Sequence, residues 1–492
     1  MDTYRNFIAG KWTESRSSKT VNNVNPANTD DIIGTVRQAT REEARAAVEA
    51  AAEAFRSWRA TPAPARGKIV AKAARLMEEA KEDLAQILTR EEGKTLGESR
   101  GEVQRSINVA EFCAGESRRM NGETILSELP SNFVYTIKQP LGVVACVTPW
   151  NFPVAIPTWK IAPALVAGNT VVFKPATLTP ATAVRIVEIF EQAGVPPGVL
   201  NLILGSGSDA GDEIINHPAV KAISFTGSNP VGIRLYEQVS RRGAKCQCEM
   251  GGKNPVVILE DADMDLTVES TAQGAFGSSG QRCTATSRAI VVNQVADEFV
   301  ERIAKRAQSM RIGHGKDPQT EMGPSVDENQ FKTVLDYLNI GREDGATLVC
   351  GGERATGNGL DRGYFVRPTV FDHVTPDMRI AREEIFGPVL GVIRVKDFEE
   401  AMQVANDTEY GLSSAIFTND AARIFRFVDE IETGMTHINS PTTGGEAHIP
   451  FGGIKGTGIG DREQGSTALD FYTELKVVYV DYTGRKREGN LY

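Results

Sequence analysis

Cys283 is the residue whose type and surroundings point most directly to chemistry. It lies in the stretch SSGQRCTATSR, residues 278–288, among small and hydroxylated residues and between two arginines. A cysteine attacks through its thiolate, and Arg282 or the amides of the following turn could stabilise that charge. A buried, inert cysteine is the alternative. No histidine lies within thirty residues of Cys283, so a cysteine hydrolase would need the fold to bring one of the five histidines close.

Two other stretches could supply partners for such a nucleophile. In TPWNFP, residues 148–153, Asn151 follows a predicted buried strand, where ligands bind in open α/β sheets, and its amide could donate to an oxyanion. In CEMGGKNP, residues 248–255, Glu249 precedes two glycines that let other groups approach, and a carboxylate in a dry site can act as a general base. An ordinary turn and a surface glutamate are the respective alternatives.

The stretch FTGSNPVG, residues 225–232, also follows a predicted strand and opens a helix. Gly227 frees the backbone to turn, and Ser228 with the first helix amides could hold a diphosphate at the positive end of the helix. The spacing differs from the G-x-G-x-x-G fingerprint of dinucleotide-binding folds, so a plain strand–helix turn is the alternative.

The elements that must position these residues alternate between strands and helices. From residue 142 onward, short apolar runs such as GVVACVT, TVVFK and VKAISF are separated by helical patterns, and a second series of the same kind begins after residue 253. Continuous apolar strands between helices indicate parallel sheets covered on both faces. We therefore predict an α/β fold with two doubly wound, Rossmann-like domains.

The first 90 residues predict two amphipathic helices. Thr40 and Glu43 form a capping box at the start of a helix over 40–58. After the turn TPAPARG, apolar residues from Ile69 to Leu84 keep a spacing of three and four, which predicts one further helix. The segments 120–139 and 470–483 have no intervening helices and could pair as a protruding sheet, which another subunit would cover.

Composition narrows the class of protein. The chain has 492 residues, 41% of them apolar, and a formal charge of −10, which argues against general binding to nucleic acid or membrane surfaces. We find no signal peptide and no apolar run long enough to span a membrane. Six sparse cysteines indicate reduced thiols and a cytoplasmic location. The pair in KCQCEM is too closely spaced for a usual zinc half-site, so we expect no metal.

The order of the motifs resembles the aldehyde dehydrogenase superfamily. PWNFP, GNTVVFKPA, FTGS, EMGGKNP, GQRC, EEIFGPV and PFGGIKGTG follow one another as in that family, and the resemblance runs from FIAGKW to YTELKVV. It implies an NAD(P)-binding domain over residues 1–119 and 140–252, a catalytic domain over 253–452, and oligomerisation strands over 120–139 and 468–492. The implied assembly is a homodimer or homotetramer.

The resemblance also implies roles for individual residues. Cys283 would attack the aldehyde, Asn151 and the Cys283 amide would form the oxyanion hole, and Glu249 would activate water to hydrolyse the thioester. This scheme needs no histidine, and Glu249 favours hydrolysis over acyl transfer to coenzyme A. The implied cofactor residues are Thr148, Trp150, Lys174, Gly227, Ser228, Glu384 and Phe386.

Two further expectations concern specificity. Many NAD-selective relatives have a glutamate three residues after the lysine, where this chain has Thr177, so we expect NADP to be used well, with NAD as a second cofactor. The stretches around SNPVG and GQRCTATSR are similar to those of enzymes for α-ketoglutaric semialdehyde (2,5-dioxovalerate), with succinic semialdehyde or a broad aldehyde range as alternatives. A carboxylate-bearing substrate calls for a cationic anchor. The candidate substrate residues are Arg105, Arg282, Phe152 and Trp159.

Overall fold

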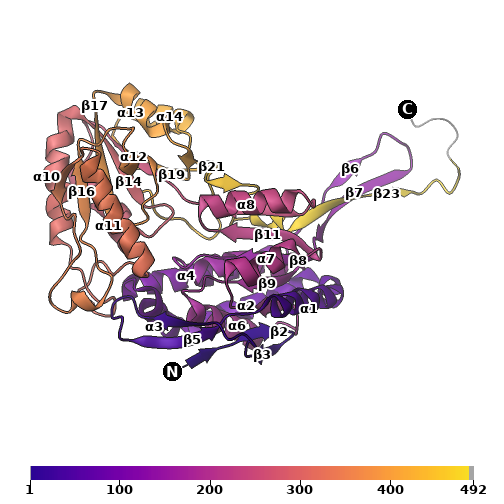
Figure 1. The fold of residues 1–492 in the computed structure, drawn as a ribbon. Helices are drawn as coiled ribbons and strands as arrows, with labels where there is room; N and C mark the ends of the chain where they lie inside the picture. The colour runs from indigo at the N-terminus through magenta and orange to yellow at the C-terminus, as the bar shows by residue number, and fades with distance from the viewer. Residues whose placement is uncertain (1, 487–492) are drawn as a thin grey trace.

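The chain forms two large β-sheets, each covered by helices, and one small sheet that protrudes from the body (Figure 1). The structure is a computed structural model and describes residues 2–486. A further three-stranded sheet, β1-β5-β4, lies near the N-terminus and is formed by Asp2–Tyr4, Ile32–Arg37 and Thr20–Val24. No helix within 2–486 is both long and apolar enough to cross a membrane.

The first large sheet has eight strands in the order β22-β12-β11-β8-β9-β10-β2-β3. Its central strands β8 to β12 are mutually parallel, whereas β2, β3 and β22 are antiparallel additions at the edges. The strands are β2 (Asn6–Ile8), β3 (Lys11–Thr13), β8 (Val143–Val147), β9 (Thr170–Lys174), β10 (Leu200–Leu202), β11 (Val220–Thr226), β12 (Lys245–Glu249) and β22 (Gly458–Ile459).

Helices cover both faces of this sheet, which explains why its strands are apolar on both sides. Side chains from α1, α7 and α8 pack with the sheet in one core, and side chains from α2 to α6 pack in another. The helices are α1 (Arg41–Ala60), α2 (Ala63–Glu79), α3 (Lys81–Glu92), α4 (Leu96–Glu116), α5 (Ala155–Ala167), α6 (Pro180–Ala193), α7 (Asp212–Asn216) and α8 (Asn229–Ser240).

The helical predictions near the N-terminus are partly correct. The Thr40–Glu43 capping box is present at the start of α1 and is confirmed. The single helix expected across Ile69–Leu84 is wrong, because α2 ends at Glu79, Ala80 leaves the helix with φ −92° and ψ 10°, and α3 begins at Lys81. Leu84 is buried and Ala80 packs against the same core, so the apolar spacing reports burial correctly but does not reveal the break in the backbone.

The second large sheet has seven strands in the order β15-β16-β17-β14-β13-β19-β20, all parallel except β15. Helices α9 and α10 share one core with it, and α11, α13 and α14 share the other. The elements are β13 (Asn254–Ile258), α9 (Met264–Phe276), β14 (Thr286–Val292), α10 (Asn293–Ser309), α11 (Glu328–Glu343), β15 (Thr347–Cys350), β16 (Thr369–Asp372), α12 (Arg379–Arg382), β17 (Val389–Val395), α13 (Phe398–Asn406), β19 (Ser413–Phe417), α14 (Ala421–Glu430) and β20 (Met435–Ile438).

The protruding sheet joins two segments that are distant in sequence. β7 (Asn132–Pro140) lies between β6 (Thr124–Leu126) and β23 (Thr473–Asp481), and the three strands extend away from the body as an arm (Figure 1). The strand expected from residue 470 starts later, because α15 (Ala468–Phe471) precedes it and its apolar residues are buried in the body. Residues 487–492, which fell within the expected oligomerisation strands, lie outside the described residues.

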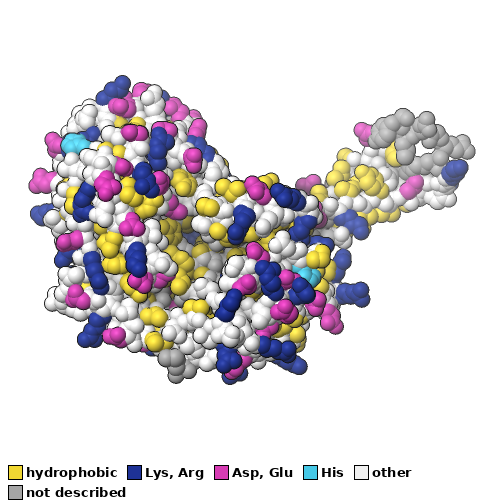
Figure 2. Space-filling model, viewed as in Figure 1, with side chains coloured by type: hydrophobic (Ala, Val, Ile, Leu, Met, Phe, Trp, Pro, Cys, Tyr) yellow, Lys and Arg dark blue, Asp and Glu magenta, His cyan; other side chains and the backbone are white. Residues whose placement is uncertain are grey.

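The two large sheets meet where the sequence motifs converge. Strands β8, β11 and β12 end just before Asn151, Gly227 and Met250, so these motifs share the carboxyl edge of the first sheet. Cys283 lies just before β14, at the amino end of the second sheet. The space-filling surface is hollowed between the two sheets (Figure 2). One cavity is lined by residues from both α/β units, and a second lies between α4 and residues 445–448.

Candidate active site

The loop before Cys283 has an unusual backbone. After α9, Ser278 and Ser279 adopt left-handed conformations with φ of 49° and 57°, and Gly280 continues with φ 68°. A Cβ on Gly280 would lie 2.1 Å from the carbonyl oxygen of Gly387, so only glycine fits there. Non-glycine residues in this region are strained, and such strain is found where the surroundings fix a functional geometry. The small residues around Cys283 therefore shape its loop.

Two carboxylates and one guanidinium act electrostatically on Cys283. Burial, followed by the charges of Glu384 and Glu249, raises the pKa of the Cys283 thiol to about 12, and the amides of Thr284 and Cys283 itself lower it. Arg105 is close enough for the Cys283 charge to raise the Arg105 pKa, although burial lowers it overall. Among the described residues that line the cavity beside Cys283, none is a histidine.

Asn151 is held against the Cys283 loop. Its Nδ2 donates to the carbonyl oxygen of Gln281 at 3.1 Å, which leaves the second amide hydrogen free, and the side chain is buried. Its backbone oxygen accepts a hydrogen bond from Lys94 Nζ at 2.7 Å. Asn151 therefore lies beside the Cys283 loop with one amide hydrogen free, and it is suited to donate to an oxyanion formed at Cys283.

Lys94 and Glu102 form a buried ion pair beneath Asn151, with Nζ 2.7 Å from Oε2. The other oxygen of Glu102 accepts from the amides of Val154 and Ala155, at the start of α5. Lys94 also lies over the ring of Phe152, 4.3 Å from its centre. Sequence analysis missed this pair because Lys94 precedes α4, Glu102 lies within it, and no local spacing connects either residue with residue 151.

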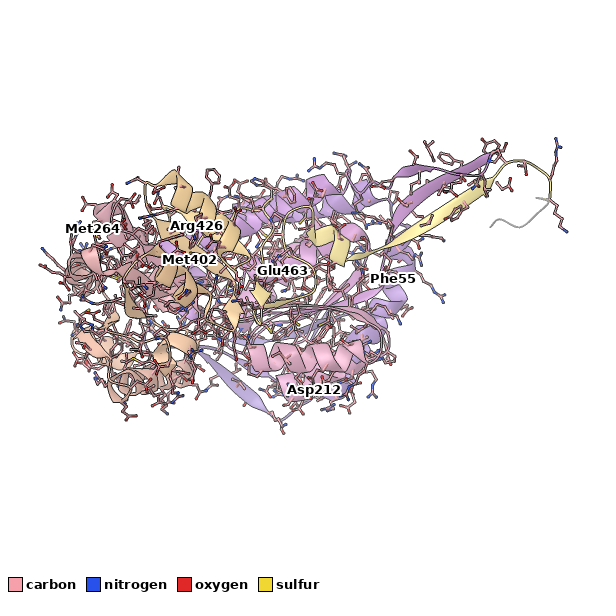
Figure 3. All side chains as sticks on the ribbon, turned by 90° about the horizontal axis from the view of Figure 1, so that it is seen from above. Phe55, Asp212, Met264, Met402, Arg426 and Glu463 are labelled. Atoms are coloured by element: carbon pink, nitrogen blue, oxygen red, sulfur yellow. The ribbon has the colours of Figure 1, made fainter. Side chains whose placement is uncertain are left out.

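Glu249 ends β12 with one carboxylate oxygen unpaired. Oε1 lies at the backbone of Gly452 and Gly453, and Oε2 has no hydrogen-bond partner among the described residues although it is buried. Burial, then the charge of Glu463, raises the pKa of Glu249 well above its ordinary value. Glu463, labelled near the middle of Figure 3, pairs with buried Lys160 of α5 and accepts from Ser224 Oγ of β11 at 3.3 Å. Glu249 is therefore a desolvated carboxyl with a free acceptor, as a general base requires.

A cavity of about 270 Å³ opens on one side of Cys283. Asn151, Gly227, Ser228, Glu384 and Phe386 line it. Ser228 is the N-cap of α8 but makes no side-chain cap bond, so its hydroxyl and the first amides of this 12-residue helix are available to an anion. These features fit the diphosphate of a dinucleotide.

The end of this cavity near Cys283 is shaped by Glu384. Glu384 accepts from the Gly252 amide at 3.1 Å, and a Cβ on Gly251 would lie 2.1 Å from its Oε2, so glycine is needed for the carboxylate to reach this place. Burial raises the Glu384 pKa to about 7. Phe386 has φ 55° and meets Trp150 edge-on at 5.5 Å. A buried carboxylate at this place can accept hydrogen bonds from the ribose hydroxyls of a dinucleotide.

Sequence analysis missed Gln330, which also lines the cavity. Its side-chain amide donates to the carbonyl oxygens of Ile385 and Phe386 at 3.0 and 2.9 Å and so holds the left-handed backbone of Phe386 in place. Gln330 lies on α11, outside every motif that the sequence pointed to, and nothing local marked it.

Lys174, Thr148 and Thr177 lie together beside the end of β9. Lys174 is buried, its Nζ donates to the carbonyl oxygen of Pro175 at 3.1 Å, and burial lowers its pKa to about 8. The Thr148 amide donates to the Lys174 carbonyl oxygen at 3.2 Å, and its hydroxyl is buried without a hydrogen-bond partner in the described residues. Thr177 is half-buried in the turn that follows.

A second cavity, of about 580 Å³, has Arg105 and residues 445–448 in its wall. Arg105 donates to the carbonyl oxygen of Gly445 and to Gln464 Oε1, the latter at 3.0 Å, and lies 5.4 Å from the ring centre of Trp159. Trp159 packs against Phe451 at 5.6 Å. Gln464 and Phe451 were not expected from the sequence, because the segment 445–465 reaches α4 and α5 only through the tertiary fold.

Three buried donors on this side have no acceptor among the described residues. They are Nε of Arg105, Nε1 of Trp159 and Nε2 of Gln464. The other candidate anchor, Arg282, is already engaged, because its guanidinium contacts Glu98 Oε1 at 3.2 Å and Ser278 Oγ at 2.9 Å. Arg105 is bonded to the neutral oxygens of Gly445 and Gln464, so its charge is available to an anion, whereas the charge of Arg282 is paired with Glu98.

Similarity to known proteins identifies the family of this chain. The model of the aldehyde dehydrogenase family matches residues 12–478. The α-ketoglutaric semialdehyde dehydrogenase of Bacillus subtilis is 46% identical over 97% of this chain and 98% of its own length, and the corresponding Haloferax volcanii enzyme is 45% identical over 98% and 100%. A betaine aldehyde dehydrogenase of Staphylococcus aureus, solved in complex with NAD⁺, superposes with a TM-score of 0.96 at 37% identity, covering 98% of this chain and 95% of that one. The chain belongs to the aldehyde dehydrogenase family.

Proposed function

We propose that this protein oxidises an aldehyde to a carboxylic acid with NAD(P) as the hydride acceptor. Cys283 gives up its thiol proton to water, its sulfur attacks the aldehyde carbon, and the free amide hydrogen of Asn151 and the Cys283 N–H bind the resulting oxyanion of the thiohemiacetal. The Ser228 end of α8 and Glu384 would hold the cofactor, which would supply the acceptor for the hydride. Loss of hydride leaves a thioester on Cys283. The fit of these residues to a dinucleotide and to an oxyanion supports this scheme.

Glu249 completes the reaction by activating water. Its unpaired Oε2 accepts a proton from water, the hydroxide attacks the thioester carbon, and the acid leaves as Cys283 regains its thiol. A cysteine hydrolase is a weaker alternative, because none of the described residues that line the cavity beside Cys283 is a histidine.

The substrate we propose is α-ketoglutaric semialdehyde (2,5-dioxovalerate). The observation that carries this choice is the group of unpaired donors around Arg105, which a carboxylate at the far end of the substrate would satisfy. Trp159 packs beside Arg105 and against Phe451, and Phe152 packs against the same core as Trp159, so these rings offer apolar surface next to the proposed anchor. The names of the Bacillus and Haloferax relatives point to the same substrate.

A panel of kcat/KM values tests the substrate. It compares 2,5-dioxovalerate, succinic semialdehyde, glutaraldehyde, hexanal and betaine aldehyde, each with both cofactors. We expect the acidic aldehydes to lead and the cationic betaine aldehyde to be poorest, because Arg105 repels a positive group. Arg105→Met should lower kcat/KM for 2,5-dioxovalerate by about 10- to 100-fold, since charge-assisted hydrogen bonds are lost, and should leave hexanal unchanged.

Two variants make this test specific. Arg105→Lys keeps the charge without the planar fork and should retain part of the preference for acids. Arg282→Lys serves as the matched control, because its partner Glu98 keeps a cation and no change in preference is expected. An equal loss on hexanal and on 2,5-dioxovalerate in Arg105→Met would remove Arg105 from substrate recognition.

For the cofactor we propose that NADP is used well, alongside NAD. Thr177 stands three residues after Lys174 with a neutral side chain, where a glutamate would repel a 2′-phosphate, and the Lys174 ammonium is the cation proposed to meet that phosphate. Measured kcat/KM values for both cofactors test this proposal. A preference for NAD of a hundredfold or more would contradict it.

We also propose that the arm β6-β7-β23 binds another subunit in a homodimer or homotetramer. It exposes apolar residues that a monomer would leave in water, and Figure 2 shows them gathered on the arm. Leu126 is 99% exposed, Tyr479 70% and Leu475 61%. Sedimentation should give an oligomer, and Leu126→Lys with Leu475→Lys should shift it toward smaller species. A monomeric wild-type protein would contradict this proposal.

A further inference from the structure

Two cysteines outside the reaction scheme face each other on β12. Cys246 and Cys248 are two residues apart on this strand, so their side chains lie on the same face, and their sulfurs are 3.5 Å apart. This is the CQC stretch that the sequence did not explain as a metal site. Within the described residues, no third histidine, cysteine or acidic side chain completes a metal cluster.

The pair combines a reachable thiol with a buried one. Cys246 is partly exposed, whereas Cys248 is buried under α8, where its sulfur lies 3.6 Å from the carbonyl oxygen of Gly232. Cys113, Cys146 and Cys350 are buried, and no second sulfur is recorded beside any of them. An external reagent can therefore meet Cys246 first, and Cys248 is then in place to react with whatever forms there.

The pair is also connected to the candidate active site through one short piece of backbone. Glu249 follows Cys248 directly, and both residues pair with β22, at Gly458 and Ile459. The Glu249 carbonyl oxygen accepts from the Gly227 amide at 3.1 Å, at the turn that opens α8. A change in the backbone at Cys248 is thus transmitted to the proposed base and to the proposed diphosphate site.

We propose that Cys246 and Cys248 are a modification site that takes up a small disulfide, such as oxidised glutathione, and closes to an intrastrand disulfide. The Cys246 thiolate attacks one sulfur of the reagent and releases one thiolate. The Cys248 sulfur then attacks the mixed disulfide at Cys246, releases the second thiol and gives up its proton to it. Two protein thiols are oxidised and one external disulfide is reduced to two thiols, so atoms and electrons balance.

The geometry of the strand opposes this disulfide, and the disulfide is therefore easily reduced. Residues two apart in a strand have Cα atoms about 6.4–6.8 Å apart, at the upper limit of the range that disulfides span, and the sulfurs must close from 3.5 Å to about 2.05 Å. The end of β12 must therefore contract, and Glu249 moves with it. Strained disulfides are readily reduced and are typical of regulated sites. The effect on turnover rests on the proposed role of Glu249, whereas formation of the disulfide does not.

Peptide mapping can test the pair separately from Cys283. Trypsin cleavage after Lys245 and Lys253 releases CQCEMGGK, which carries both cysteines, and cleavage after Arg282 releases CTATSR with Cys283 alone. The intact enzyme is treated with oxidised glutathione, alkylated and digested. We expect CQCEMGGK to lose two hydrogens without added glutathione and to regain both thiols in dithiothreitol. Free thiols, or glutathione retained on both cysteines, would overturn the proposal.

Activity assays test whether the disulfide reaches the active site. Cys246→Ser cannot form it but keeps Cys283, so it measures the inhibition that arises at Cys283 alone, and Cys350→Ser is a control that keeps the pair. We expect wild type and Cys350→Ser to lose steady-state turnover in proportion to the disulfide fraction, to keep a burst of reduced cofactor, and to recover in dithiothreitol. Equal losses in Cys246→Ser would overturn the link to Glu249, even where mapping detects the disulfide.

Discussion

The two sides of Cys283 are built in different ways. The cofactor side consists of strand ends, helix amides and glycines that make room for other groups, such as Gly251 beside Glu384. The aldehyde side consists of long side chains from α4, α5 and the segment 445–465, with Arg105, Trp159 and Gln464 at its centre. Backbone groups hold a ligand whatever side chains surround them, whereas side chains can be exchanged to suit one substrate. Variants on the two sides should therefore fail in different ways.

Replacement of Cys283, which both sides share, should have the largest effect. Cys283→Ala removes the nucleophile, so we expect dehydrogenase activity to fall by about 10⁴-fold or more. The cofactor side does not depend on the sulfur, so the Kd for NADP, measured by quenching of protein fluorescence, should stay within a few-fold of wild type. Substantial remaining oxidation would disprove the role of Cys283, and lost cofactor binding would show that the two sides are not independent.

Glu249→Gln should separate the chemistry of the two half-reactions. The amide cannot take a proton from water, so turnover should fall by about 10²–10⁴-fold while a burst of reduced cofactor and an acyl-enzyme persist. Stopped flow at 340 nm and intact mass spectrometry measure both. Unimpaired steady-state turnover would exclude Glu249 as the base.

The pH dependence provides a second readout of the same residue. Burial and Glu463 raise the Glu249 pKa, and a base works only when deprotonated, so the rate of thioester hydrolysis should rise with pH. The pKa of Cys283, raised to about 12, likewise makes the attack step faster as the pH rises, because the thiolate is the nucleophile. In Glu249→Gln the slow steady state should lose its rise with pH while the burst keeps one. A wild-type hydrolysis rate that falls with increasing pH would contradict the assignment.

The alternation of strands and helices in the sequence predicted both large sheets. The candidate residues Cys283, Glu249 and Ser228 could be named from the sequence because each lies at or just beside the end of an element whose apolar pattern is clear. Sequence reasoning failed where a site is assembled from distant elements. Lys94, Gln330 and Gln464 carry no local pattern, and Phe451 lies in a quoted motif that did not reveal its contact with Trp159. The choice between Arg105 and Arg282 depended on Glu98, which shares α4 with Arg105 but is far from Arg282 in the sequence.

Variants of Asn151 and Lys94 test whether Lys94, which the sequence did not point to, acts by positioning Asn151, which the sequence did point to. Asn151→Ala removes an oxyanion donor and should lower kcat by about 10²–10³-fold. Lys94→Met releases the Asn151 backbone and should lower kcat less, with the KM for NADP unchanged. If Lys94 is a positioning residue for Asn151, the double variant should be no slower than Asn151→Ala alone. Fully additive losses would mean that Lys94 acts elsewhere, and the melting temperature of each variant reports general destabilisation.

The smallest effect is expected at Thr177, on the cofactor side but far from the reacting atoms. Thr177→Glu places a carboxylate near Lys174, where it should repel a 2′-phosphate and leave a ribose hydroxyl free to bond. We expect kcat/KM with NADP to fall about tenfold, equivalent to ~1.4 kcal/mol, with little change for NAD. Thr177→Gln has the same shape as the glutamate variant without its charge, so the difference between the two isolates electrostatics. Because the aldehyde side is untouched, the order of preference among aldehydes should stay the same in both variants. A change in that order would show that the two sides of Cys283 communicate.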